Sequence, residues 1–158
     1  MHFPIKTVVI FIFLLSTSKA NGIVELGTST NFILAGINNA NLKLQTHILL
    51  HLGRVALGPV VRYQHFNTEM QESIVALGFR IDTPVYIQLE AGVLEREAFG
   101  LKGSGTAATF TIGSRISEHV FLEMPIIYRN IPDSEEDNTL NGRTQIDLVP
   151  MFGVSIGG

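Results

Sequence analysis

The segment from residue 41 to 52 alternates between apolar and polar side chains over twelve residues. One face holds Leu42, Leu44, Thr46, Ile48, Leu50 and Leu52, and the other holds Lys43, Gln45, His47 and His51. Only Leu49 breaks the pattern. Side chains of a β-strand point alternately to opposite sides, so this period of two predicts a strand whose faces contact unlike surroundings.

The same alternation recurs along the chain and predicts eight strands. They are expected at residues 22–35, 41–52, 54–65, 70–81, 84–96, 105–116, 119–130 and 142–156. Short turns and longer connections alternate between them, and the two longest are expected at residues 97–104 and 131–141, both on the outer side. An even number of strands joined in this way predicts an all-β, eight-stranded, antiparallel, up-and-down transmembrane barrel.

Large apolar residues occupy one face of the predicted strands, and no charge interrupts them. After residue 52 this face holds Val55, Leu57, Val61, Tyr63, Val75, Leu77, Phe79, Ile81, Val85, Ile87, Leu89, Ala91, Val93, Ala108, Phe110, Ile112, Val120, Leu122, Met124, Ile126, Tyr128, Ile146, Leu148, Phe152, Val154 and Ile156. A charge in the middle of a barrel's lipid face costs about 2–4 kcal/mol, so its absence favours contact with lipid. Alternation alone does not say which face points inward. The bulk of the apolar side chains favours the outward assignment.

The opposite face mixes charges of both signs with small residues. Its expected polar network comprises Glu25, Lys43, His47, Arg62, Glu72, Arg80, Glu90, Arg115, Glu123, Arg129, Arg143 and Asp147. Gln45, Gln64, Gln88, Arg96, Thr111 and Gln145 lie on the same face, with glycines and alanines between them. An eight-stranded barrel is only just wide enough to be filled by its own side chains, so these groups are expected to pair and plug the interior. The arginines are expected to neutralise Glu72, Glu90, Glu123 and Asp147 in one shared network.

The N-terminus is typical of an export signal. A basic start with Lys6 is followed by an apolar run from Thr7 to Leu15 and by small residues up to Ala20. This run is too short to span a bilayer, so residues 1–20 are predicted to be a cleaved signal peptide and residues 21–158 the barrel domain. A buried N-terminal strand or an anchor is the alternative.

Composition excludes several classes of function. The chain has no cysteine, which excludes a disulfide framework, a thiolate metal site and a cysteine nucleophile. Its formal net charge of −3 makes it a poor candidate for nucleic-acid binding. After residue 20 no apolar run approaches the roughly 20 residues of a membrane helix, so insertion into a membrane would have to use strands. No cofactor is expected.

Two expected outer loops carry the candidate contact residues. Phe99 and Leu101 form a small apolar tip among glycines, and Asp133, Glu135, Glu136 and Asp137 form the one acidic run. The acidic run lacks the spacing, glycine and distal glutamate of an EF-hand, so no metal site is assigned. Bridging by divalent ions to anionic lipopolysaccharide stays an alternative for this loop.

The histidines do not predict a catalytic site. His47 and His51 lie four residues apart on one strand, about 13 Å at strand rise, which is too far for one metal centre. His65 has no serine beside it in the sequence, so Ser73 or Ser104 would have to approach it through folding. Ordinary polar histidines of the interior or the rim are the expectation.

In strand number and polarity the chain resembles the small eight-stranded outer-membrane proteins of Gram-negative bacteria, the group that contains the OmpA transmembrane domain and OmpX. The resemblance covers residues 21–158 and concerns architecture, since no short motif identifies one family. Two features depart from it: the chain ends in Gly157 and Gly158 with Phe152 as the last aromatic residue, and it has no tryptophan. Pro59, Pro125 and Pro150 fall inside predicted strands, so bulges or strand ends are expected there.

The expected function is non-enzymatic. The resemblance implies a monomer in the cell outer membrane with a structural, adhesive or envelope-integrity role through its outer loops. The implied partners are outer-membrane lipid, lipopolysaccharide and the barrel assembly machinery, with no nucleic acid. One alternative is a soluble, lipocalin-like periplasmic carrier of a lipid or another hydrophobic ligand, and another is an outer-membrane enzyme that modifies lipid A.

Overall fold

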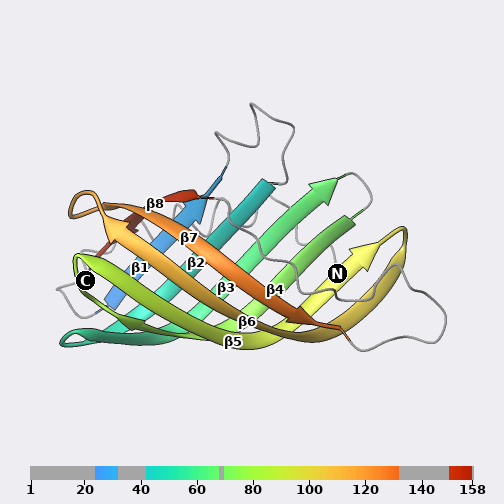
Figure 1. Ribbon diagram of the computed structural model, residues 1–158, viewed down its shortest axis with the longest axis horizontal. Coiled ribbons are helices and arrows are strands. Elements are labelled where there is room, and N and C mark those ends of the chain that lie inside the picture. The colour runs from blue at the N-terminus through green and yellow to red at the C-terminus, as the bar shows by residue number, and fades with distance from the viewer. Residues whose placement is uncertain (1–23, 32–41, 68–69, 132–149, 158) are drawn as a thin grey trace.

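The protein folds into a closed ring of eight antiparallel strands, each hydrogen-bonded to its sequence neighbours and the last to the first (Figure 1). The computed structural model describes residues 24–31, 42–67, 70–131 and 150–157. The strands are β1 (Val24–Thr30), β2 (Leu42–Leu52), β3 (Val55–Asn67), β4 (Met70–Ile81), β5 (Val85–Ala98), β6 (Leu101–Arg115), β7 (Val120–Asn130) and β8 (Met151–Ile156). The predicted all-β, antiparallel, up-and-down architecture is therefore confirmed. Residues 1–23, with the expected signal peptide, lie outside the described part.

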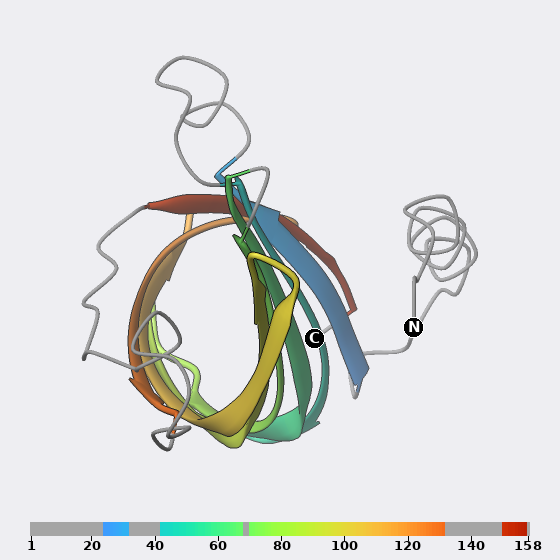
Figure 2. The same cartoon turned by 90° about the vertical axis from the view of Figure 1, so that its right-hand side faces the viewer.

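The strand register fixes the tilt and the width of the barrel. A path across paired residues runs from Asn130 through Thr106, Val93, Val75, Val61, Thr46, Thr28 and Val154 to Val120. After one turn around the barrel the path returns to β7 at Val120, ten residues from its start at Asn130. This offset of ten residues, at about 3.3 Å each, is compared with a circumference of eight strands, at about 4.8 Å each. The ratio corresponds to a strand tilt of about 41°, within the usual range for barrels. The view along the ring shows one rounded enclosure (Figure 2).

The two faces of the strands differ sharply in exposure. On β5, Leu89 is 52% exposed and the next residue, Glu90, is 4% exposed. The described apolar residues assigned above to the outward face all lie on the outer surface, exposed or half-exposed. Ile146 and Leu148 are outside the described residues. The pleat thus turns the charged side chains inward and the large apolar ones outward.

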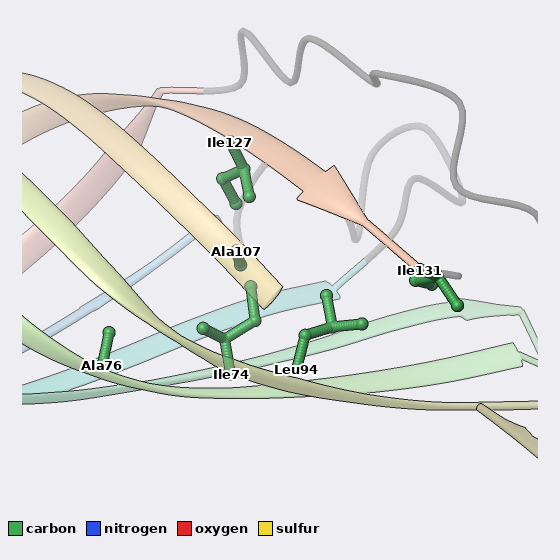
Figure 3. Packing of buried hydrophobic residues seen from close by; sticks show 6 residues of the cluster. All are labelled: Ile74, Ala76, Leu94, Ala107, Ile127 and Ile131. Carbon is green, nitrogen blue, oxygen red and sulfur yellow. The ribbon is translucent and has the colours of Figure 1, made fainter. Parts of the chain in front are cut away.

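The interior also contains an apolar cluster that the alternation does not predict. Ile74, Ala76, Leu94, Ala107, Ile127 and Ile131 pack together on the inner side of β4 to β7 (Figure 3). Leu49 and Val60 are fully buried as well. The sequence predicts a polar interior. The structure shows instead that the interior also contains a core of aliphatic side chains.

The expected loop at residues 97–104 is wrong. β5 continues to Ala98 and β6 begins at Leu101, so only Phe99 and Gly100 connect them, with φ angles of 52° and 80°. The glycines of this segment suggested a loop, but Gly105 is a strand residue close to β7. A Cβ atom there would collide with the backbone of Asn130 and approach the Cα of Ile131 to 3.0 Å. The predicted alternation of short and long connections therefore fails at this hairpin.

The prolines are accommodated in three ways. Pro150 precedes β8, which agrees with the expected strand end. At Pro59 the β2–β3 pairing skips two residues, between His47–Val60 and Leu50–Leu57, while the pairing with β4 continues. The expectation is wrong for Pro125, which lies in an uninterrupted ladder with β6.

The described strand ends depart from the expected ones mainly at the termini of the barrel. β1 ends at Thr30, short of the expected residue 35. Residues 142–149, the first part of the last expected strand, are outside the described part. No described helix is long and apolar enough to cross a bilayer.

Candidate functional site

The charged side chains inside the barrel include three ion-paired groups at different heights. We call the end of the barrel with the connections at 53–54, 82–84 and 116–119 the turn end, and the opposite end the loop end. The group at the turn end comprises Glu25, His47, His51, Arg80, Asp82 and Arg115 and is called the turn-end cluster. Four of its members lie on β1, β2 and β4, and Arg115 is the last residue of β6.

Glu25 is the centre of the turn-end cluster. Its Oε1 lies 2.9 Å from His47 Nε2 and accepts a hydrogen bond of 2.8 Å from Arg80 Nη1. Its Oε2 accepts a bond of 2.6 Å from Arg80 Nη2, lies 3.2 Å from His51 Nε2, and is also bonded by Arg115 Nη2. A fully buried carboxylate is stable only with such partners, so this site is held by charge pairing.

The register explains why both imidazoles reach one carboxylate. Glu25 stands opposite Leu49 in the β1–β2 ladder, so His47 and His51 flank it on the same inner face. Although the backbones of His47 and His51 are far apart along β2, both side chains lean toward Glu25 on the neighbouring strand. The sequence argument from strand rise alone missed this convergence.

Asp82 completes the turn-end cluster and was not among the predicted site residues. Its carboxylate lies 2.8 Å from Arg80 Nε and 3.1 Å from His51 Nδ1. Neither contact is an aligned hydrogen bond, since neither carboxylate oxygen has a hydrogen-bond partner in the described part of the chain. Asp82 follows the last residue of β4, and its place in a turn concealed its inward contacts from the sequence pattern.

The middle group joins β3 to β5. Arg62 donates through Nε and Nη2 to the two carboxylate oxygens of Glu90, at 2.8 and 2.6 Å. Gln88 donates to the same carboxylate at 2.7 Å, and Arg62 also reaches the hydroxyl of Thr111 at 3.1 Å. This two-pronged pairing is the strong geometry for an arginine and a carboxylate.

In the described part of the chain, Glu123 accepts hydrogen bonds from two hydroxyl groups. The hydroxyl of Tyr86 donates to Oε2 at 3.1 Å, and the hydroxyl of Ser29 donates to Oε1. The ring of Phe121 packs beside both His47 and Tyr86, with centroid distances of 5.9 and 6.4 Å. Tyr86 and Phe121 are interior residues that the sequence analysis did not assign to either face.

The group at the loop end centres on Glu72. Its Oε2 accepts hydrogen bonds from Arg96 at 3.1 and 2.7 Å, and its Oε1 accepts one from Arg129 at 2.7 Å. Arg129 also donates to Gln64 at 2.8 Å. Among the described residues, arginines therefore neutralise Glu72 and Glu90 as expected, and Arg80 and Arg115 pair with Glu25.

The remaining predicted site residues have varied positions. Lys43 is buried on β2. Phe99 and Leu101 are 59% and 43% exposed at the tip of the β5–β6 hairpin. Leu101 is the first residue of β6, so it belongs to a strand and not to the expected loop. Arg143, Asp147, Asp133, Glu135, Glu136 and Asp137 lie outside the described residues.

The described interior has the chemistry of structural ion pairing. Glu25, Glu72 and Glu90 accept hydrogen bonds from arginines, and Glu123 accepts them from hydroxyl groups. Within the described ranges, no three histidine or acidic side chains are grouped so that they could hold a metal ion. Neither a protein-family model nor a curated protein sequence matches this chain.

Proposed function

We propose that this protein is a non-enzymatic outer-membrane barrel with a plugged interior and a structural or adhesive role at its loop end. The finer likeness to the OmpA transmembrane domain and OmpX belongs to this proposal. Strand number, antiparallel order and the inward direction of the charges support it. An export signal at residues 1–20 would bring the chain to that membrane.

The observation that carries the proposal is an apolar band on the outside of the described strands. Exposed large apolar residues occur on every strand, for example Val24 on β1, Leu89 on β5 and Val154 on β8. Monomeric soluble proteins rarely expose connected apolar patches larger than a few hundred Å². A band that encircles a barrel is the surface that acyl chains would cover.

The height of this band fits a bilayer. On β5 the outward apolar residues run from Val85 to Val93, and on β7 they run from Val120 to Tyr128. Eight steps of about 3.3 Å at a tilt of about 41° span about 20 Å, close to the roughly 25 Å of known outer-membrane barrels. Beyond the band toward the loop end, the outward positions become polar at Glu95 and Asn130.

The interior supports a plug and not a pore. On β5, Leu94 of the apolar cluster lies between Glu90 of the middle group and Arg96 of the loop-end group. The buried aliphatic cluster and the directly paired charges support an interior that is filled by side chains. We therefore expect no steady conductance from the reconstituted protein.

The loop end is the proposed contact surface because Phe99 and Leu101 are exposed there, at the tip of the β5–β6 hairpin. Rigid scaffolds commonly carry their binding residues on the connections between strands. In the sequence, the acidic run of residues 133–137 follows β7, which ends at Asn130 at the loop end.

Cell fractionation and gel mobility test the proposal together. The full chain, expressed in a Gram-negative host, should be recovered in the detergent-extracted outer membrane and should migrate differently before and after boiling. Release by osmotic shock would refute the membrane assignment and favour a soluble carrier. Steady channels of nanosiemens size in a planar bilayer would refute the plug, and an altered acylation of lipid A on expression would favour the enzyme.

A further inference from the structure

We propose that the barrel wall has a built-in weak seam between β2 and β3, at Ile48 and Pro59, which opens locally while the ladders of β5 stay closed. The β2–β3 pairing is interrupted in mid-strand, where residues 48–49 face residues 58–59 outside the ladder. The ladders of β5 with β4 and with β6 run without a break. The interruption therefore distinguishes this contact from regular ladders of the same barrel.

The direction of the Pro59 nitrogen explains the interruption. The N–H of Asp82 donates to the carbonyl of Arg54 at 2.7 Å, in register with the β3–β4 ladder. Even-numbered residues of β3 therefore bond to β4, and odd-numbered ones bond to β2. Pro59 is odd-numbered and has no N–H. The ladder with β4 continues through Pro59, while β2 lacks the donor that belongs opposite Ile48.

The carbonyl of Ile48 faces a carbon atom at this point. A Cβ atom on Gly58 would collide with the Ile48 oxygen and would lie 3.1 Å from the Cα of Leu49, so the two backbones are in direct contact. A Cα–H group is a much weaker donor than an N–H. Ile48 is also part of the outward apolar surface, where hydrocarbon would supply no replacement donor. The seam is therefore held by fewer hydrogen bonds than the same length of a regular ladder.

Opening of the seam exposes Leu49. This residue breaks the apolar and polar alternation of β2, and it is fully buried on the inner face between His47 and His51. Gly58, its neighbour across the seam, has no side chain that could cover it. Proteins open locally where backbone bonds and packing are weakest. A small apolar molecule outside the barrel should therefore reach Leu49 before it reaches inward residues behind unbroken ladders.

Cysteine labelling tests the proposal, because the chain has no cysteine of its own. Leu49→Cys and Leu94→Cys place a thiol at two fully buried positions, and Leu94 belongs to the two unbroken ladders of β5. The variants are folded in detergent micelles, and folding is checked by gel mobility before boiling. A small uncharged maleimide should modify Leu49→Cys about tenfold faster, the factor expected from one missing hydrogen bond. Equal rates would overturn the proposal.

Two proline replacements separate the seam from other causes of fast labelling. Pro59→Val restores the missing N–H and should slow the labelling of Leu49→Cys about tenfold. Pro125→Val is the matched control. The N–H of Ile116 donates to the carbonyl of Val120 at 2.8 Å, so even-numbered residues of β7 bond to β6 and the Pro125 nitrogen points away from that unbroken ladder. Pro125→Val should leave the rate unchanged. A rate that Pro59→Val does not alter, or that both replacements slow equally, contradicts a seam at Pro59.

Amide hydrogen exchange of the unmodified protein decides the question if Pro59→Val does not fold. Ile48 and Leu89 are matched outward residues in the interior of β2 and β5. The N–H of Ile48 should exchange about tenfold faster than that of Leu89. Equal protection of the two amides would refute the seam. Both measurements are made in micelles, so their outcome is independent of where the barrel resides in the cell.

Discussion

The ring of Tyr86 lies over Gly113, the residue directly opposite it in the β5–β6 ladder. A Cβ atom at Gly113 would collide with Cζ and the hydroxyl oxygen of Tyr86. The same relationship holds for His47 over Gly27 and for Phe121 over Gly153, each a directly paired residue on a neighbouring strand. These glycines make room for three of the rings that fill the interior toward the turn end.

Replacing Gly113 with alanine should therefore destabilise the barrel. Tyr86 cannot move freely, because it is bonded to Glu123 and lies 5.1 Å from the Arg80 guanidinium. We expect a loss of about 1–3 kcal/mol, the usual cost of overpacking, in urea unfolding followed by circular dichroism in lipid vesicles. The control Ala108→Val adds bulk to the outer face of the same strand and should change stability by less than about 0.5 kcal/mol. Equal effects of the two changes would contradict the close packing of Tyr86 on Gly113.

The Arg62–Glu90 pair should contribute far more than an exposed pair of the same chain. Replacing Arg62 with alanine leaves the Glu90 carboxylate buried without its main partner, so we expect a loss of about 3–5 kcal/mol. In a double-mutant cycle, Glu90→Ala should restore part of this loss and give a coupling of about 0.5–3 kcal/mol.

The Lys102–Glu97 pair is the matched control. Its atoms are 3.9 Å apart and the lysine side chain is 71% exposed, so Lys102→Ala should cost no more than about 1 kcal/mol. A cost for Arg62→Ala as small as that for Lys102→Ala would show that the middle group is hydrated and not a packed part of the interior.

The outer band gives a prediction about the surroundings of the barrel. Leu89 pairs with Phe79 and Phe110 near the middle of the apolar surface. Arginine at this position should cost about 2–4 kcal/mol in a bilayer. Ser104→Arg, at an exposed outward position beyond the band, should be nearly neutral in the same vesicle titration. If Leu89→Arg were equally neutral, acyl chains would not contact this surface.

The sequence predicts the strands well because one physical signal repeats in each of them. Residues such as Leu89 and Glu90 differ strongly in polarity, so a period of two identifies both the strand and its two faces. The failures occur where polarity does not alternate. Ile74 and Val75, or Ile126 and Ile127, are adjacent apolar pairs, and their inner members form the cluster that the pattern did not predict. Such apolar pairs were the available signal for an apolar layer inside the barrel.

Partners across the interior could not be predicted, because they depend on the register of the closed ring. Arg80 reaches Glu25 across 55 residues of sequence, and the choice between Glu25 and Glu123 depends on a stagger that no single strand reveals. Asp82 was missed for a related reason. It lies in a turn, where composition indicates solvent, and only the neighbouring positions of Arg80 and His51 turn it toward the interior.

The β5–β6 hairpin gives the last prediction. Phe99 has a φ of 52°, a left-handed conformation that costs about 1–2 kcal/mol for most residues and that Asn adopts readily. Asn-Gly is also the preferred sequence for a two-residue hairpin connection of this kind. Phe99→Asn should therefore stabilise the barrel by about 1 kcal/mol in urea unfolding.

Phe99→Ala separates the backbone effect from loss of the ring. Alanine removes the exposed ring but keeps the unfavourable conformation, so it should not give the gain expected for asparagine. Lower stability of Phe99→Asn than of the unmodified protein would show that the ring contributes contacts that outweigh the backbone cost. If the gain is observed, Phe99 makes the barrel less stable than asparagine would. Its retention at the exposed tip then favours selection of the Phe99 side chain for contact with another molecule.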